Sequence, residues 1–185
     1  MPPSAPYVVA ANHYSHFDPP VIACGLDRPV RFLALDNLFT ESRLLNWLIT
    51  GYGAIPTPRQ RRPIGAVRTA LSALAAGEVV GVFPEATRVS HWGTLPPRRG
   101  AAWLACRAEV PLLPVAVIGT GQTFGLDNKL RRAPLRLVVG TALDSGAGET
   151  SLMTAWSEWI SETISRFPGT EVSGPPRSEW DGHQG

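Results

Sequence analysis

The chain has 185 residues, of which 44% are hydrophobic and 17% are charged, and its formal net charge is +2. This composition excludes a disordered or fibrous chain, and the length is sufficient for one domain with a full hydrophobic core. No stretch approaches the ~18 consecutive apolar residues that a transmembrane helix needs, so any contact with a membrane is expected to be peripheral.

The charges are distributed unevenly along the chain. Residues 42–77 contain no acidic residue but include five arginines, namely Arg43, Arg59, Arg61, Arg62 and Arg68. Such a basic zone suits a phosphate-bearing substrate or an anionic membrane surface, and a solvated face is the alternative interpretation. The chain carries only two cysteines, Cys24 and Cys106, without metal-ligand spacing, and its first residues form no charged leader. We therefore expect a protein of the reducing cytoplasm.

Short apolar runs alternate with segments of helical spacing along the first 167 residues. In chain order, the predicted elements are a strand at 7–11, a helix at 21–26 preceded by two prolines, a strand at 30–35, a helix at 38–49, an extended piece at 54–55, a helix at 64–77, a strand at 79–83, a helix at 100–107, strands at 112–118 and 135–139, and a closing helix at 151–167. This alternation predicts a single α/β domain over 1–167, with a mostly parallel or mixed central sheet flanked by helices. The Gly-, Pro-, Ser- and acid-rich segment 168–185 is predicted to be a disordered tail.

A histidine and an aspartate follow the first predicted strand. His13 comes two residues after Ala11, and Asp18 stands five residues later, just before Pro19 and Pro20. If the carboxylate accepts from Nδ1 of the imidazole, Nε2 becomes a general base at neutral pH. A helix N-cap is the alternative role for Asp18. A metal site that adds His16 is a weaker possibility, since no further cluster of ligands lies nearby in the sequence.

Phe83-Pro84-Glu85-Ala86-Thr87-Arg88 follows another buried run and supplies a cation for an anionic substrate. The sequence does not carry convincing motifs of two other classes of protein. No Gly-x-Ser-x-Gly elbow is present, which argues against an α/β-hydrolase nucleophile. Gly119-Thr120-Gly121 follows a strand, but no convincing helix or ribose-binding acid comes after it, so dinucleotide binding is weakly supported.

Four segments in order resemble the signature blocks of the glycerolipid acyltransferase family, the lysophosphatidic acid (1-acylglycerol-3-phosphate) acyltransferases. They are Asn12-His13-x-Ser15-x-x-Asp18, Gly53-Ala54-Ile55-Pro56-Thr57-Pro58-Arg59, Phe83-Pro84-Glu85-Ala86-Thr87-Arg88 and Val110-Pro111-Leu112-Leu113-Pro114-Val115. The third block differs from the family pattern, because Ala86 stands where glycine is usual.

The resemblance implies a glycerol-3-phosphate acyltransferase-like fold and direct transfer of an acyl group from acyl-CoA or acyl-carrier protein to a lysophospholipid hydroxyl. His13 would be the base and Asp18 its orienting partner. The acceptor would be bound by Arg59, Glu85, Thr87 and Arg88. The resemblance implies acyl donors as co-substrates rather than a metal or another cofactor, and it implies a cytoplasmic protein that associates peripherally with an anionic membrane surface, without nucleic acid as a partner. A non-catalytic lipid- or acyl-CoA-binding module and an acyl thioesterase are the alternatives.

Overall fold

The computed structural model describes residues 4, 6–26, 28–36, 49–58, 63–127 and 129–169. Its centre is a six-stranded sheet in the order β3-β2-β4-β1-β5-β6. The strands are β1 (Tyr7–Ala11), β2 (Val30–Leu35), β3 (Ile55–Thr57), β4 (Val79–Val82), β5 (Leu112–Ile118) and β6 (Arg136–Val139). All neighbouring strands pair in parallel except β6, which is antiparallel to β5. The predicted α/β class and the mostly parallel sheet are therefore confirmed.

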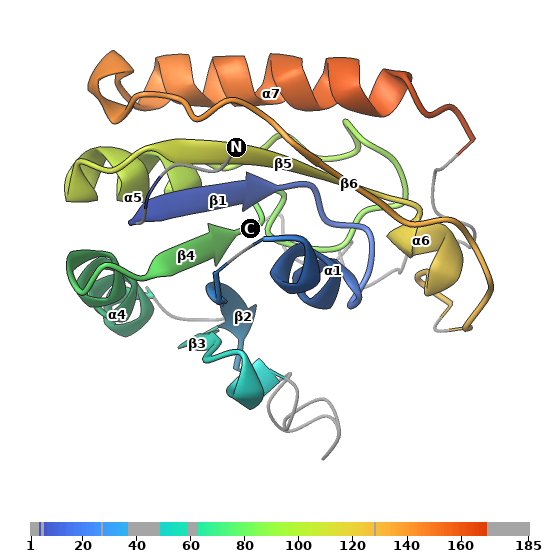
Figure 1. Ribbon diagram of the computed structural model, residues 1–185, viewed down its shortest axis with the longest axis horizontal. Helices are drawn as coiled ribbons and strands as arrows, with labels where there is room; N and C mark the ends of the chain where they lie inside the picture. The colour runs from blue at the N-terminus through green and yellow to red at the C-terminus, as the bar shows by residue number, and fades with distance from the viewer. Residues whose placement is uncertain are drawn as a thin grey trace, which may run out of the picture.

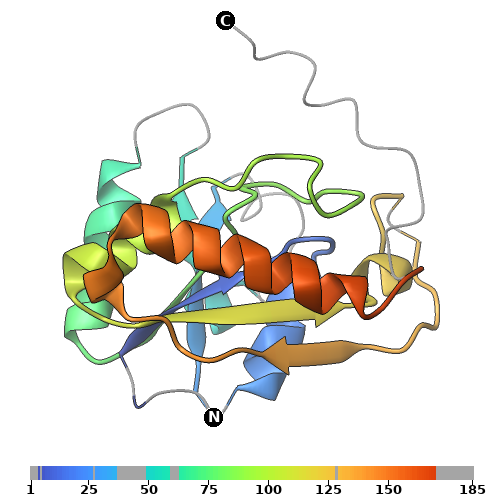
Figure 2. The ribbon, with the colours of Figure 1, turned by 90° about the horizontal axis from the view of Figure 1, so that it is seen from above.

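Helices cover both faces of this sheet (Figures 1 and 2). The helices are α1 (Asp18–Gly25), α4 (Ile64–Ala75), α5 (Gly100–Ala108), α6 (Thr120–Thr123) and α7 (Glu149–Ser165), with a 3₁₀ turn at Ser145–Ala147. Alternate residues of β1 enter different cores, with Val8 beside α4, α5 and α7 and Val9 on the side of α1. Every residue of β1, β4 and β5 is buried, as expected for parallel strands enclosed on both faces.

The apolar runs located the long strands well, and the differences have local causes. β1, β2 and β5 match the predicted bounds, whereas β3 extends to Thr57 and β6 begins one residue later than predicted. Helix α1 begins at Asp18 rather than near Val21, because a helix tolerates prolines in its first turn, where the N–H groups lack intrahelical partners. The four-residue α6 was not predicted. The predicted helix 38–49 lies outside the described residues except for Ile49, as does all but the start of the predicted tail at 168–185.

None of the helices in the described part of the chain is long and apolar enough to cross a membrane.

Strand order decides where the polar segments meet. β1 and β4 are parallel neighbours in the sheet, although about seventy residues separate them in the chain. Their carboxyl ends therefore lie side by side, and the two segments that follow them leave from the same edge of the sheet. In open α/β sheets, ligands bind outside the carboxyl ends of the strands. We call this edge the carboxyl edge.

Candidate active site

His13 and Asp18 are paired at the carboxyl edge. Nδ1 of His13 lies 2.8 Å from Oδ2 of Asp18. The imidazole is 16% exposed, whereas the carboxylate is fully buried. Because an ionised carboxylate only accepts hydrogen bonds, it fixes the tautomer with hydrogen on Nδ1 and leaves the lone pair on Nε2. The pair therefore has the geometry of a general base with its orienting carboxylate.

Asp18 also organises the turn that carries His13. The same Oδ2 atom accepts the backbone N–H groups of Tyr14 at 2.7 Å and Ser15 at 2.8 Å. Asp18 is the first residue of α1, and the residue before it, Phe17, makes no side-chain cap. The carboxylate thus closes the preceding loop rather than capping the N–H groups of its own helix. The capping interpretation of Asp18 is wrong for this reason.

The third block and the residue after it bind the main chain of His13 on both sides. Oε2 of Glu85 accepts the backbone N–H of His13 at 2.5 Å. The backbone N–H of Val89, immediately after Arg88, donates to the carbonyl of His13 at 3.0 Å. Both main-chain groups of His13 are therefore used by the segment that follows β4, and the backbone of His13 is fixed relative to that segment.

Glu85 is itself buried and is only 2% exposed. Burial raises the pKa of Glu85 from 4.5 to about 8, the His13 N–H opposes this rise, and the charge of Asp18 adds to it. At neutral pH the side chain is therefore mostly a neutral acid. Its Oε1 atom makes no hydrogen bond within the described part of the chain. Binding of acceptor hydroxyls by Glu85 stays a prediction and concerns this second oxygen.

An aromatic stack supports the imidazole. The rings of His13 and Phe83 are stacked with centroids 4.0 Å apart and an interplanar angle of 16°. Phe83 in turn stacks on Phe32 of β2 at 5.0 Å and 12°. Contact with a ring face shields one side of the imidazole from water and restricts its rotation. Together with Asp18 and Glu85, this stack leaves His13 little freedom to change rotamer.

Two buried polar residues of the first block fasten the loop. The side-chain amide of Asn12 both donates to and accepts from the backbone of Val117, at 2.9 and 2.8 Å, and so continues the ladder between β1 and β5. The hydroxyl of Ser15 donates to the carbonyl of Phe124 at 2.7 Å. The sequence reasoning assigned no role to Asn12, Ser15 or Phe83. A polar residue inside an apolar run needs a buried partner, and that was the available signal for Asn12.

Ala86 adopts a left-handed backbone conformation, with φ of +60°. It closes the turn in which its N–H donates to the carbonyl of Phe83, and its side chain is exposed. This conformation places Cβ near the following carbonyl, and only glycine avoids that contact. The turn therefore keeps a geometry suited to the glycine of the family pattern, although alanine occupies the position.

Replacing Ala86 with glycine is expected to stabilise the protein by about 0.5–1 kcal/mol, since relief of the backbone strain exceeds the entropy gained by the unfolded chain. Thermal unfolding should show a rise in melting temperature of about 1–4 °C. Glu109→Gly is the matched control, because Glu109 has a φ of +55° at the end of α5, away from the site. A gain with Glu109→Gly but not with Ala86→Gly would contradict the strained turn.

The remaining predicted residues are only partly placed. Thr87 and Arg88 lie in the half-buried end of the third block, directly before the Val89 N–H that binds His13. Arg59 lies outside the described residues, as do Arg43, Arg61 and Arg62 of the basic zone. His16 is half-buried in the same loop as His13. Within the described ranges, no three or more His, Cys, Asp or Glu side chains converge as metal ligands would.

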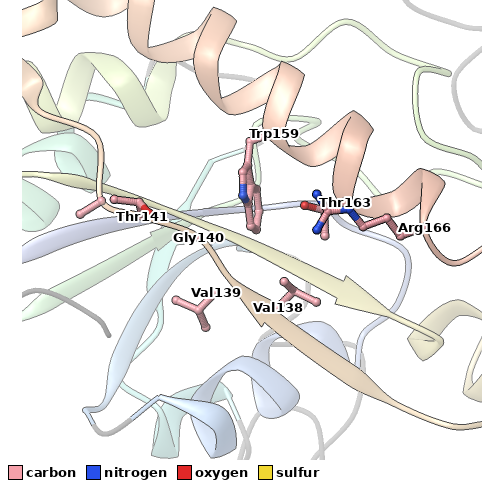
Figure 3. Close-up of a pocket in the computed structure, with 8 residues that line it drawn as sticks. Val138, Val139, Gly140, Thr141, Trp159, Thr163 and Arg166 are labelled. Atoms are coloured by element: carbon pink, nitrogen blue, oxygen red, sulfur yellow. The ribbon is translucent and has the colours of Figure 1, made fainter.

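A separate groove of about 470 Å³ lies between β6 and α7, and none of its lining residues belongs to the four blocks. Figure 3 shows Trp159 of α7 beside Gly140, the residue that follows β6. A Cβ on Gly140 would come within 2.7 Å of the Trp159 ring, so close packing of the helix on this edge requires glycine there. We therefore interpret this groove as a result of the packing of α7 on the edge strand β6.

A family model described as acyltransferase matches residues 1–118, which include all four blocks. The chain belongs to the acyltransferase family. The resemblance inferred from the sequence is thereby confirmed. The acyltransferase match also includes β1, β4 and β5, the strands that build the carboxyl edge around His13.

This acyltransferase-family chain is also similar in sequence to individual acyltransferases. It is 26% identical over 144 residues to the 1-acyl-sn-glycerol-3-phosphate acyltransferase of Bacillus subtilis, covering 77% of this chain and 69% of the relative. It is 35% identical over 130 residues to the mouse 1-acyl-sn-glycerol-3-phosphate acyltransferase alpha, covering 67% and 44%. The match to the Chlamydomonas reinhardtii relative covers half of that protein.

A solved structure has the same fold. The crystal structure of the 1-acyl-sn-glycerophosphate acyltransferase PlsC from Thermotoga maritima superposes with a TM-score of 0.76 at 25% identity. The superposition covers 90% of this chain and 68% of the other. The arrangement of the sheet and its helices is thus shared with an acyltransferase of known structure.

Proposed function

We propose that the protein transfers a fatty acyl group to the free hydroxyl of 1-acylglycerol-3-phosphate, giving phosphatidic acid. The observation that carries this proposal is the 2.8 Å contact between His13 Nδ1 and Asp18 Oδ2 at the carboxyl edge. A binding module would not need a base held in this way. The similarity to 1-acyl-sn-glycerol-3-phosphate acyltransferases supports the choice of acceptor.

The proposed reaction is a direct transfer without a covalent acyl-enzyme. Nε2 of His13 takes the proton from the acceptor hydroxyl as the hydroxyl oxygen attacks the thioester carbonyl carbon. The tetrahedral adduct then collapses, the C–S bond breaks, and the imidazolium returns the proton to the leaving thiolate. Asp18 keeps the ring oriented and stabilises the imidazolium during the transfer.

Arginine side chains are proposed to bind the acceptor phosphate. Arg88 follows the turn that holds Glu85 and precedes Val89, whose N–H binds His13. A phosphate bound by Arg88 would therefore be attached to the segment that fixes the base. Guanidinium groups bind phosphate through charge-assisted and often bidentate hydrogen bonds. Arg59 and Thr87 are proposed as further contacts on the basis of the family blocks.

The donor and the location of the reaction complete the proposal. The acyl group would arrive as a thioester of coenzyme A or acyl-carrier protein, and proton transfer by His13 calls for no metal or other cofactor. We propose that the protein is cytoplasmic. Because the acceptor and product are amphiphilic, it would meet its substrate at a membrane surface.

Release of free thiol from acyl-CoA, followed with and without lysophosphatidic acid, tests the function. Acceptor-dependent release together with formation of phosphatidic acid supports the proposal. Release that does not depend on the acceptor would instead indicate a thioesterase. Absence of release with acyl-CoA and with acyl-carrier protein, despite measurable binding of the donor, would indicate a binding module.

Replacing Arg88 with alanine is expected to raise the KM for lysophosphatidic acid by about tenfold or more, because a charge-assisted contact to phosphate is lost. The KM for monoacylglycerol, which lacks the phosphate, should change little. Steady-state kinetics with both acceptors measures the difference. Arg98→Ala is the control, since Arg98 is an exposed arginine further along the same segment. Equal effects on the two acceptors would contradict phosphate binding by Arg88.

A further inference from the structure

An unusual surface lies in the connection between α6 and β6. Among the residues that the structure describes, four large apolar side chains are exposed, and two of them stand five residues apart. They are Leu130, which is 72% exposed, and Leu135, which is 43% exposed. We call residues 129–136 the basic arm, with the sequence Lys129-Leu130-Arg131-Arg132-Ala133-Pro134-Leu135-Arg136.

Positive charge surrounds the two leucines. The basic arm contains four cations and no acidic residue. The neighbouring Asp127 forms an ion pair with Arg131, and this contact keeps the pKa of Asp127 well below its usual range. Lys129 and Arg132 are exposed, and the guanidinium of Arg136 lies 5.3 Å from the centroid of the Phe167 ring. Cations and exposed aliphatic side chains are therefore interleaved on one short segment.

The backbone of the arm is well held, so the leucines are not exposed simply because the segment lacks structure. Leu130 forms an antiparallel bridge with Phe124, and the N–H of Arg131 donates to the carbonyl of Thr123 at 2.7 Å. At the other end, Pro134 lies against Gly119, where a Cβ would come within 2.1 Å of the Pro134 carbonyl oxygen. A segment with a held backbone that still leaves aliphatic side chains in water suits an interaction surface.

The arm is connected to the active-site loop. Phe124 accepts the Ser15 hydroxyl at 2.7 Å, and its ring lies 5.0 Å from that of Phe17. A shallow groove of about 450 Å³ runs between Leu135 and Leu137 on one side and Val21 of α1 on the other. α6 lies at the carboxyl edge, at the opposite end of the molecule from α4 (Figure 1). A surface bound by the arm would therefore face the end of the molecule that carries His13.

We propose that the basic arm binds the surface of an anionic lipid bilayer, with Leu130 and Leu135 entering the headgroup region and the cations contacting lipid phosphates. Interleaved aliphatic and cationic side chains match both the acyl and the phosphate layer of such a surface, whereas a nucleic acid would use the cations alone. This inference rests on the proposed function in one respect, since the bilayer would deliver the amphiphilic acceptor. It assigns a membrane contact to the arm, which lies outside the basic zone of residues 42–77.

The test is co-sedimentation of the full chain with vesicles of phosphatidylcholine, with and without phosphatidylglycerol. We expect binding that requires phosphatidylglycerol and weakens with salt. The double variant Leu130→Ser/Arg132→Gln should bind at least about tenfold more weakly, because one cation near such a surface is already worth about fivefold. Ile64→Ser/Arg68→Gln is the matched control, with one exposed aliphatic residue and one exposed arginine on α4, and it should bind like the wild type.

Three results would overturn the inference: equal binding of wild type and arm variant, a loss confined to the α4 control, or binding that ignores phosphatidylglycerol. Acyl transfer to a short-chain, monomeric lysophosphatidic acid without vesicles separates this inference from the proposed function. The arm variant should keep this activity and lose activity only on vesicle-embedded acceptor. A wild type that binds vesicles as expected but transfers no acyl group would contradict the function and leave the surface intact.

Discussion

Replacing His13 with alanine is expected to lower kcat for acyl transfer by a factor of about 10²–10⁴, which is the usual contribution of a positioned general base. KM should change little, because the acceptor phosphate is assigned to the arginines rather than to the imidazole. The residual rate would come from binding and orienting the two substrates. Thiol release from acyl-CoA in the presence of lysophosphatidic acid, measured at saturating acceptor, gives kcat directly.

The control for this variant is His16→Ala, which removes a second histidine from the same loop. His16 stands three residues from His13, and Asp18 pairs with the imidazole of His13. The His16 variant should keep kcat within a few-fold of the wild type. The melting temperature of the His13 variant should fall only modestly, since its loop is also held by bonds to the backbone of residue 13. An unchanged kcat in the His13 variant would contradict its assignment as the base.

The part of the site that the sequence could predict is local. His13 and Asp18 are five residues apart in one turn, so chain geometry allows the contact that the structure shows. The buried strands could also be predicted from the sequence, because a run such as residues 112–118 is apolar on both faces. Helix α6 could not be predicted in the same way, since a four-residue element is too short to show a periodic pattern.

The part that could not be predicted depends on which strands become neighbours. Glu85 and His13 are 72 residues apart, and their contact exists because β4 pairs with β1. The bonds between Asn12 and Val117 span 105 residues and require β5 on the other side of β1. The family resemblance implied only that Glu85 would bind the acceptor. The strand order adds a different contact, in which one oxygen of Glu85 fixes the main chain of the base.

The same contact explains why the first and third blocks act as one unit. The N–H and C=O of His13 bind residues on both sides of the turn at Ala86, and the ring of His13 stacks on Phe83 at the start of that turn. A shift of the third block would therefore move the base as well as Arg88. This connection relates the position of the proposed phosphate site to the position of the base.

Replacing Glu85 with glutamine is expected to remove much of the pH dependence of folding stability. In the folded protein burial raises the pKa of Glu85 to about 8, against an ordinary value of 4.5. Between these two values the folded state retains a proton that the unfolded state has lost. The contribution of Glu85 to stability is therefore greatest below about pH 4.5 and falls as the pH rises, until the folded carboxyl has also ionised above about pH 8.

The expected size of this effect is large for one side chain. Each pKa unit corresponds to about 1.4 kcal/mol, so the wild type should lose on the order of 4 kcal/mol from this group between pH 4.5 and pH 8. Glutamine has nearly the same shape, stays neutral, and can accept the His13 N–H through its amide oxygen. Its stability should match that of the wild type near pH 5 and exceed it by a few kcal/mol near pH 9.

Urea unfolding of both proteins at pH 5, 7 and 9 measures the difference, and Glu158→Gln serves as the control because Glu158 is an exposed carboxylate on α7. The control should follow the wild type at every pH. Parallel curves for the wild type and the Glu85 variant would contradict a neutral buried Glu85. If the stabilities of the wild type and the Glu85 variant diverge with pH as expected, the two carboxyl groups beside His13 have opposite roles near neutral pH. Asp18 carries the charge that orients the imidazole, whereas Glu85 stays protonated and fixes the backbone without adding a second buried charge beside Asp18.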